Sequence, residues 1–250
     1  MMTQENNFRR QKPDSIYSWK VTDASPLMVA VEAKLKDHKR GSIKSMMKYG
    51  QIAVNGFPVS QFDYALEEGD TISVNFTRPF VIFRHPRIKM VYEDNDIIVI
   101  NKGNGILSVS TDNVKDGTAY SALRNYLKEK DPGLKLFIVH RLDRDTSGLM
   151  LFAKSIEAKE AMQHNWNNMV LNRKYVAVVE GKVEEKQGVM QSYLMENSQF
   201  EVYSTDDKEN GQLAVTRFTT IKTKNGYSLM ELELDTGRKN QIRVHMKDMG

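Results

Sequence analysis

Cysteine is absent from this 250-residue chain, which removes several classes of chemistry at once. Without thiols the protein has no disulfide bond, no thiolate nucleophile and no cysteine-ligated zinc or iron–sulfur centre. Long apolar runs are missing as well. The opening residues, MMTQENNFRR, contain no signal-peptide core, and no later run approaches the length that crosses a bilayer. These absences predict a cytoplasmic protein that has no membrane partner.

Basic residues slightly outnumber acidic residues. The formal net charge is +4 at pH 7 and the pI is about 9.0. A basic surplus favours a polyanionic partner, although many basic proteins bind none. The chain is 27% charged and 40% hydrophobic, as in ordinary globular proteins, and its length fits one large or two unequal domains.

The most unusual stretch is FIVHRLDRDTSGLMLFAK, which runs from Phe137 to Lys154. Apolar runs at 136–139 and 149–153 predict two buried strands. The loop between them is polar and charged, and Gly148 closes it. Its polar side chains are those of His140, Arg141, Asp143, Arg144, Asp145, Thr146 and Ser147. Loops held by rigid strands are where catalytic and binding groups concentrate, so we expect a functional site here.

The polar side chains of this loop could also bind a metal ion or have a purely structural role. His140, Asp143 and Asp145 could ligate a metal, but Arg141 and Arg144 would repel a cation, so we expect no metal. The two aspartates could instead only accept hydrogen bonds in a turn and a helix cap. Such a structural role suits Asp145 better than it suits the loop as a whole.

The first part of the chain predicts a tail and a small basic module. Residues 1–24 are unpatterned and polar, which is typical of a flexible tail. Residues 25–78 then predict two short helices and a small sheet. The first helix has an apolar face at Met28, Val31 and Leu35, and we expect Ser42 to cap the second.

Basic side chains are concentrated on or between these two helices: Lys34, Lys36, Lys39, Arg40, Lys44 and Lys48. They could form an ordinary solvated face or a surface that binds phosphates. The pattern GQIAVNG followed by LEEGDTISV resembles the alpha-L RNA-binding domain first described in ribosomal protein S-four. The resemblance covers residues 26 to about 75. It implies RNA binding, with Arg40, Lys44 and Lys48 as phosphate contacts.

A proline-bounded linker, residues 79–88, leads to a second domain over 89–250. Its apolar run Ile97–Ile100 predicts a buried strand, and Thr118 should cap a helix that ends near Asp131. Another helix should start at Ser155, and most of the remaining sequence alternates as strands do. The sequence thus predicts an α+β fold in which the larger domain contains a mixed, mostly antiparallel sheet.

Two more motifs stand out in this domain. The first is KYVAVVEG, whose Tyr175 is by default a half-buried strand aromatic. The second is ELDTGRKNQIRVHM, in which a turn at 235–237 precedes a helix. That arrangement puts Arg238, Arg243 and His245 near one helix start. Each motif alone is a weak signal.

Taken together, the ordered motifs carry a specific resemblance. HRLDRDTSGLMLFAKS, KYVAVVEG and TGRKNQIRVHM, with the opening YEDNDIIVINKGNGI, resemble the RluA-like, large-subunit type of pseudouridine synthase. The resemblance covers about residues 90 to 250. It implies a reaction in which the bond between ribose and nitrogen 1 of a uridine in RNA is broken. The uracil is then turned and rejoined through carbon 5.

The resemblance also implies roles for individual residues. Asp143 is the catalytic aspartate, acting by attack on the sugar or by proton removal. Arg243 supplies a charge that favours its ionised form, and Tyr175 packs on the target uracil. Arg141 fills the space that the flipped base vacates. The other expected substrate contacts are His140, Thr146 and Arg238.

No cofactor or metal is implied, and the expected partner is RNA. Ribosomal RNA is the first candidate substrate, transfer RNA is the second, and the protein is expected to be a monomer. Two alternatives remain open: a non-catalytic RNA-binding protein that keeps the fold, and a hydrolase that releases free uracil.

Two departures from the family pattern matter. Gly103 follows the lysine where the family usually has proline, and the family's last motif continues beyond Met249 and Gly250. We therefore expect a shortened chain whose last helix, starting near Lys239, exposes Ile242 and Met246.

Overall fold

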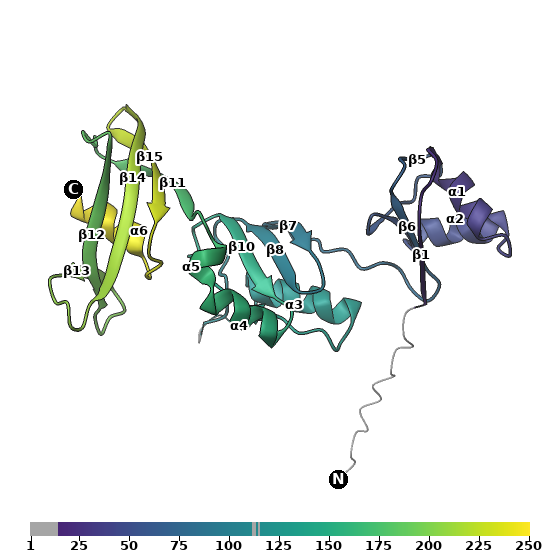
Figure 1. Ribbon diagram of the computed structural model, residues 1–250, viewed down its shortest axis with the longest axis horizontal. Coiled ribbons are helices and arrows are strands. Elements are labelled where there is room, and N and C mark those ends of the chain that lie inside the picture. Colours follow the sequence, from purple (N-terminus) through teal and green to yellow (C-terminus); the bar gives the residue numbers. More distant parts are fainter. Residues whose placement is uncertain (1–14, 112–113, 115) are drawn as a thin grey trace, which may run out of the picture. The chain divides into compact units, whose positions relative to one another are not determined.

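The computed structural model describes residues 15–111, 114 and 116–250. It divides into two compact units, Met1–Ile156 and Glu157–Gly250 (Figure 1). This boundary falls inside the domain that the sequence predicted over 89–250. The domain limits given above therefore stay a prediction, and each unit is described by itself.

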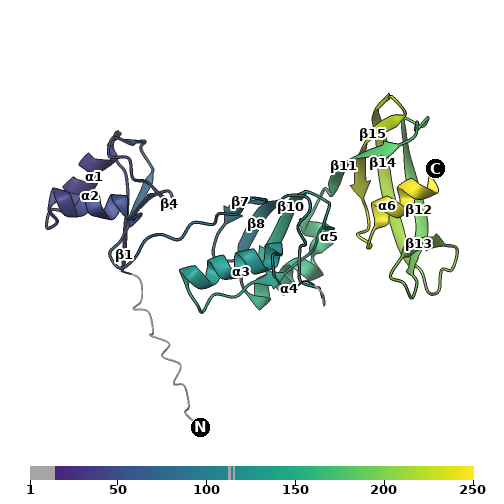
Figure 2. The same ribbon diagram turned by 180° about the vertical axis from the view of Figure 1, so that it is seen from behind.

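The first unit begins with a module of two helices and small sheets. Four strands form a sheet in the order β1-β6-β3-β4, and β2 pairs with β5. Helices α1 and α2 lie side by side in this module (Figure 2). The helices pack on it through Leu27, Val31, Ile43 and Met47, none of which is exposed. The elements are β1 (Ile16–Lys20), β2 (Ser25–Pro26), α1 (Leu27–Lys34), α2 (Arg40–Lys48), β3 (Ile52–Val54), β4 (Phe57–Pro58), β5 (Ala65–Leu66) and β6 (Thr71–Asn75).

Two predictions about this module are wrong. Residues 16–20, predicted as part of a flexible tail, form β1 and pair with β6, and Trp19 packs on the core. Most β1 side chains are exposed, so the strand arises from backbone pairing rather than from an apolar pattern. The rest of the predicted tail up to residue 14 lies outside the described residues. Ser42 does not cap α2, because Lys39 is the N-cap and accepts from the Ser42 N–H at 2.8 Å.

The first unit also contains a second four-stranded sheet, in the order β7-β8-β10-β9. Its two inner strands, β8 and β10, carry the predicted apolar runs. Thr118 caps α3 as predicted, because its hydroxyl accepts from the Ser121 N–H at 3.1 Å. The elements are β7 (Ile88–Glu93), β8 (Ile97–Lys102), α3 (Ala119–Lys130), β9 (Phe137–Ile138) and β10 (Gly148–Ala153).

A half-buried carboxylate links β7 to α3 and to the residue after β10. Glu93 on β7 accepts hydrogen bonds from the Tyr126 hydroxyl at 2.6 Å and the Lys130 ammonium at 2.9 Å, both on α3. It also accepts from Lys154, just after β10, at 3.1 Å. These bonds lower the pKa of Glu93, although burial acts in the opposite direction. The end of β10 and helix α3 are thereby held to the edge strand β7.

The second unit is a five-stranded sheet in the order β11-β15-β14-β12-β13, with α6 packed on one face (Figure 1). Tyr175, Leu232 and Phe218 form one cross-strand row. The row continues to Gly188, where a Cβ atom would lie 2.6 Å from the Phe218 ring, so only glycine fits. The elements are α4 (Ile156–His164), α5 (Trp166–Met169), β11 (Lys174–Glu180), β12 (Gln187–Glu196), β13 (Val202–Thr205), β14 (Gln212–Lys224), β15 (Tyr227–Leu234) and α6 (Gln241–Asp248).

Helix α6 corrects another expectation. Ile242 and Met246 were predicted to be exposed, but they pack half-buried on the cluster of Phe218, Met230 and Leu232. Their apolar surface is partly covered because the sheet of the same unit lies beneath the helix.

The α+β class is confirmed. Every strand pair among the described residues is antiparallel, and the predicted larger domain contains two separate hydrogen-bonded sheets rather than one. No helix in the described part of the chain is long and apolar enough to span a membrane.

Candidate active site

The loop that carries Asp143 is fixed from its N-terminal side by a buried serine. Ser108, which is 3% exposed, accepts from the Leu142 N–H at 3.1 Å and donates to the Leu142 carbonyl at 2.5 Å. Both backbone groups of the residue before Asp143 are thereby engaged. Buried side-chain-to-backbone bonds of this kind fix a loop that has no regular ladder of its own.

On the other side of Asp143 the loop is fixed by a buried lysine. Lys102 ends β8, has no exposed surface, and donates from Nζ to the Arg144 carbonyl at 3.1 Å. The same ammonium donates to the carbonyls of Gly103 at 3.0 Å and Ile106 at 2.9 Å. Its three donors are thus used, which is what allows a cation to be buried. Asp143 therefore lies between two anchored peptide units.

Lys102 also sets the charge around the loop. Burial lowers the pKa of the Lys102 ammonium, and the charges of Asp145 and Asp143 oppose that shift. The carboxylates whose charges act on this buried cation are therefore those of the loop. Asp143 itself is half-buried.

Lys102 and Ser108 were not singled out from the sequence. The signal was present for the lysine, because Lys102 directly continues the apolar run Ile97–Ile100 after one asparagine. A lysine on a buried strand almost always has a specific partner. Nothing in the local pattern around Ser108 distinguishes it from an ordinary loop serine.

The remaining loop residues differ in how exposed they are to solvent. Asp145 is exposed and forms an ion pair with Arg144 at 3.4 Å. Thr146 is half-buried, and its N–H donates to the Asp143 carbonyl at 3.2 Å, which closes a turn. Arg141 is exposed. The exposed cations of the loop are available to a polyanion.

The side chain of His140 is hydrogen-bonded to strand β10. Its Nε2 accepts a hydrogen bond from the Leu151 N–H of β10 at 3.1 Å. Burial lowers the pKa of His140 to about 4, so the ring is neutral at pH 7. A neutral ring can accept at Nε2, as this bond requires. His140 therefore anchors the start of the loop to β10.

In the second unit, a buried polar chain attaches α6 to the sheet. His245 and Gln241, each 2% exposed, lie one turn apart and both bond the buried Thr216 hydroxyl, at 2.8 and 2.9 Å. His245 Nε2 also bonds Ser192 at 3.0 Å. Gln241 accepts from the Arg238 N–H at 3.0 Å. Burial lowers the pKa of His245, and Asp248 opposes the shift.

Three predicted site residues lie in the second unit: Tyr175, Arg238 and Arg243. Arg243, two positions after Gln241, lies on the exposed side of α6. Tyr175 is half-buried on β11 and packs on the same apolar cluster as Ile242 and Met246 of α6. Arg238 uses its Nε to bond the Leu213 carbonyl at 2.9 Å. The structure thus brings Tyr175 and the helix that carries Arg243 to one face of one sheet.

The predicted phosphate contacts of the N-terminal module differ from one another. Arg40 is paired with Glu32, with one guanidinium nitrogen 2.8 and 3.0 Å from the two carboxylate oxygens. Lys44 and Lys48 are exposed, and neither is paired with any carboxylate in the described part of the chain. The charge of Arg40 is partly neutralised and those of the two lysines are not.

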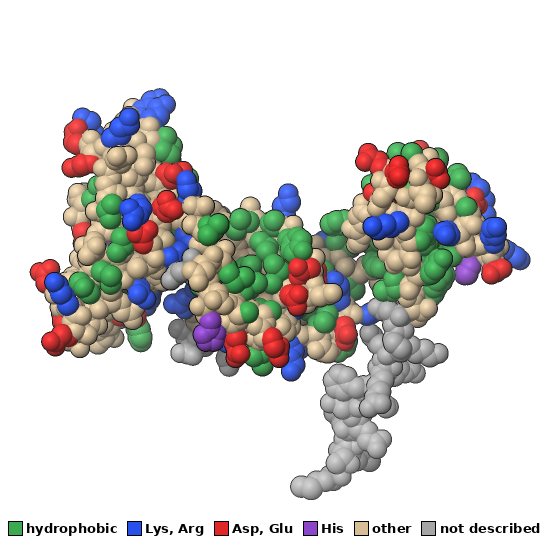
Figure 3. Space-filling view, in the orientation of Figure 1, with side chains coloured by type: hydrophobic (Ala, Val, Ile, Leu, Met, Phe, Trp, Pro, Cys, Tyr) green, Lys and Arg blue, Asp and Glu red, His purple; other side chains and the backbone are tan. Residues whose placement is uncertain are grey.

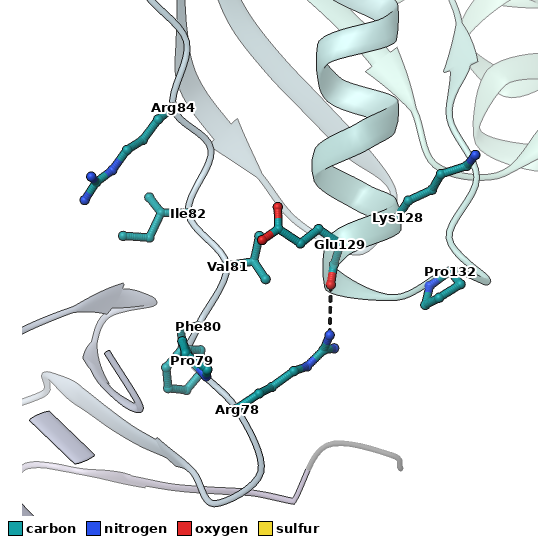
Figure 4. Close-up of a pocket in the computed structure, with 9 residues that line it drawn as sticks. All are labelled: Arg78, Pro79, Phe80, Val81, Ile82, Arg84, Lys128, Glu129 and Pro132. Carbon is teal, nitrogen blue, oxygen red and sulfur yellow. Dashed lines mark hydrogen bonds between the residues drawn. The ribbon is translucent and has the colours of Figure 1, made fainter. Parts of the chain in front are cut away.

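A separate hollow of about 480 Å³ lies between the residue stretch 78–84 and the end of α3 (Figure 4). Arg78 donates there to the Glu129 carbonyl at 2.8 Å and also to the Lys130 carbonyl. A cation at a helix C-terminus is favoured by the helix dipole. The lining contains none of the predicted catalytic residues. Among the described residues no group of three or more His, Cys, Asp or Glu side chains could hold a metal ion.

Comparison with known proteins identifies the family. The family described as RNA pseudouridylate synthase matches residues 96–248. An uncharacterised RNA pseudouridine synthase of Bacillus subtilis, YlyB, is 32% identical over 220 residues, covering 86% of this chain and 72% of the relative. Ribosomal large subunit pseudouridine synthase C of Rickettsia typhi is 30% identical over 236 residues, covering 84% of this chain and 74% of the relative.

A third relative is similar in sequence, and two solved structures are similar in fold. Ribosomal large subunit pseudouridine synthase D of Borreliella burgdorferi is 32% identical over 197 residues, covering 76% of this chain and 59% of the relative. Human RNA pseudouridylate synthase domain containing 4 shares the fold with a TM-score of 0.52 at 23% identity, covering 64% of this chain and 63% of that one. Human RNA pseudouridylate synthase domain containing 1 has a TM-score of 0.50 at 22% identity, covering 65% of each chain.

The matched region includes the Asp143 loop, the Tyr175 strand and helix α6. The chain therefore belongs to the RNA pseudouridylate synthase family, whose members isomerise uridine to pseudouridine in RNA.

Proposed function

We propose that this chain isomerises a uridine of ribosomal RNA and that Asp143 is its catalytic carboxylate. The observation that carries the proposal is the pair of anchors around Asp143. Ser108 binds both backbone groups of Leu142, and Lys102 binds the Arg144 carbonyl. A reactive group gains most when its position is fixed before the substrate arrives. Two relatives named as ribosomal large subunit synthases support the choice of ribosomal RNA.

The charge distribution supports the same assignment. Lys102 is a buried cation whose field acts on Asp143 and Asp145, but only Asp143 is half-buried. We propose that Asp143 takes part in the reaction and that Asp145 has a structural role in the loop. Arg141, exposed beside the aspartate, would then occupy the space of the flipped base. His140 and Thr146 would contact the substrate from the same loop.

The second unit supplies three further proposed groups. By the family resemblance alone, Tyr175 would pack on the target uracil and Arg243 would favour the ionised form of the catalytic carboxylate. Their support is the shared apolar cluster beneath β11 and α6, together with the exposure of Arg243. Arg238 would contact the RNA near the start of α6, where its Nε is already fixed by the Leu213 carbonyl.

The N-terminal module, by its resemblance to the S-four type, is proposed to bind RNA without taking part in the chemistry. Lys44 and Lys48 would contact phosphates, and Arg40 would contribute less because Glu32 pairs with it. Transfer RNA is a second candidate substrate. We further propose that the protein acts as a monomer in the cytoplasm.

The test is to map pseudouridines in ribosomal RNA from cells that contain or lack the protein, and from cells that carry Asp143→Asn. One or more sites should require the wild-type chain and disappear with the variant. Purified Asp143→Asn should bind RNA but release no tritium from uridine labelled at carbon 5. Normal release by a folded Asp143→Asn protein would overturn the assignment of Asp143. An unchanged map without the protein would overturn ribosomal RNA as the substrate.

A further inference from the structure

Four lysine ammonium groups in the described part of the chain lie over aromatic rings, and they are not equivalent. Lys130 lies over Tyr126 at 5.2 Å but is bonded to Glu93. Lys239 lies over Phe200 at 5.8 Å but is bonded to Glu196 at 2.6 Å. In both places a carboxylate neutralises the lysine. These two pairs are explained by contacts within the protein.

The other two pairs have no such carboxylate, and both lie on the N-terminal module. Lys44 lies over Phe62 at 5.3 Å, and Lys48 lies over Tyr49 at 5.7 Å. Neither lysine is ion-paired with any carboxylate that the structure describes. Lys44 and Lys48 are four residues apart on α2, so they project from the same side of the helix. We call these four side chains the α2 surface.

Both rings of the α2 surface are exposed. Tyr49 is 60% exposed and Phe62 is 43% exposed. Hydrophobic and basic side chains are intermixed over the helices of this module (Figure 3). An exposed ring keeps one face free when a lysine occupies the other. An aromatic face of this kind is a stacking platform for a planar group.

The chemistry of the surface selects one kind of ligand. Two uncompensated ammonium groups one helical turn apart attract successive phosphates. Two open rings beside them accept stacked bases, which are available only where the RNA is unpaired. A folded protein partner would be expected to supply carboxylates in place of phosphates. The combination therefore fits single-stranded RNA better than duplex RNA or protein.

We propose that the α2 surface binds an unpaired segment of RNA, with bases stacked on Tyr49 and Phe62 and phosphates held by Lys44 and Lys48. The inference rests on the proposed RNA-binding role of the module and extends it to the class of RNA. It assigns to the module a preference for single strands, which would lead the enzyme to looped or opened regions of its substrate.

The experiment uses the full chain and measures affinity for a short oligouridine without secondary structure and for an RNA duplex of equal length. Tyr49→Leu and Phe62→Leu should each weaken single-strand binding by about fivefold or more, the lower end of the effect of losing one stacked base. Neither change should alter the salt dependence. Lys44→Gln and Lys48→Gln should weaken binding to both RNAs and lower the single-strand salt slope by about 0.7 each.

Phe200→Leu is the matched control, because it removes an exposed ring under a lysine that Glu196 neutralises. It should leave both affinities unchanged. Thermal unfolding checks that each variant is folded.

Single-strand affinity that is unchanged in Tyr49→Leu and Phe62→Leu would overturn the inference. If the lysine variants still bind RNA more weakly, the module remains an RNA-binding surface that contacts phosphates alone. If none of the four variants changes RNA affinity, the proposed RNA role of the module falls too, and the surface would suit a protein partner. Turnover by the wild-type chain tests the catalytic proposal separately.

Discussion

The loop that carries Asp143 and the helix that carries Arg243 are both held by buried polar side chains, but by different chemistry. The loop is held by a buried cation, Lys102, that donates to three backbone carbonyls. Helix α6 is held by neutral groups, in which Gln241 and His245 share the Thr216 hydroxyl. One region fixes position and adds charge, whereas the other fixes position alone.

The two anchors differ because the loop and the helix differ in how many of their backbone groups already have hydrogen-bond partners. The loop at 139–147 has few backbone ladder bonds, so a donor with three protons can satisfy several of its neighbours at once. Helix α6 already satisfies its own backbone, and it needs only to be fixed in rotation and register on the sheet. Neutral side chains one turn apart do this without placing a charge beneath Arg243. The charged anchor therefore lies beneath the loop that carries Asp143, and the neutral anchor lies beneath the helix that carries Arg243.

Removing the charged anchor should have the largest effect. Lys102→Met keeps the apolar stem but leaves buried carbonyls without a donor, so we expect a loss of about 3 kcal/mol or more in the free energy of unfolding. A carboxylate that loses a nearby cation holds its proton more tightly. The acidic limb of the turnover profile should therefore move to higher pH, as measured by tritium release across pH.

Lys154→Met is the control for this change, because Lys154 is also a largely buried lysine, bonded to Glu93 rather than to the loop. It should destabilise the protein without moving the turnover profile. If Lys102→Met does not fold, Lys102→Gln retains one donor group and can replace it. A folded Lys102 variant with an unchanged pH profile would show that the lysine carries no electrostatic role.

The dependence of stability on pH tests whether His140 is neutral in the folded protein. Burial lowers the pKa of His140 from 6.5 to about 4, so the unfolded chain takes up a proton first as the pH falls. The stability that a neutral His140 allows is complete above about pH 6.5 and is lost as the pH falls from there through 4. We expect a decrease of about 2 kcal/mol between pH 7 and pH 5, measured by denaturant unfolding. In His140→Gln, which can still accept from Leu151, this pH dependence should be smaller by that amount. An equal slope in both proteins would contradict the assignment.

Breaking the neutral anchor should cost less than breaking the charged one. His245→Phe fills the same space but removes a partner from Thr216 and Ser192, so we expect a loss of about 1–2 kcal/mol in unfolding free energy. The rate constant kcat should fall more than RNA affinity, because α6 would no longer hold Arg243 firmly. Lys247→Gln, an exposed change on the same helix, is the control and should alter neither quantity. Loss of RNA affinity at full kcat would contradict a positioning role.

The smallest effect is expected at Asp145. Its ion pair with Arg144 is exposed, with side-chain exposures of 55% and 64%, and such pairs contribute at most about 1 kcal/mol. Asp145→Asn should keep measurable turnover and nearly full stability. Complete loss of tritium release from a folded Asp145→Asn protein would mean that the two loop carboxylates share the catalytic role.

Much of the architecture could be predicted from local sequence. The β-branched run at 97–100, the apolar run at 149–153 and the Thr118 cap all form the elements that their patterns indicated. Strand β1 and the start of α2 could not be predicted in this way. The β1 side chains are mostly exposed, so only pairing with β6 reveals the strand. For α2, a lysine serves as N-cap without any side-chain bond, and no residue preference marks it.

The sequence by itself determined the family and the charged loop, because both depend on which residues follow one another. The tertiary structure decided which of those residues are fixed and by what. Lys102 and Ser108 approach the two neighbours of Asp143 from 34 to 42 positions away along the chain. Thr216 joins Gln241 and His245 from 25 and 29 positions away. Hydrogen bonds across such separations arise only when strands and helices pack, and no periodic pattern in the sequence encodes them.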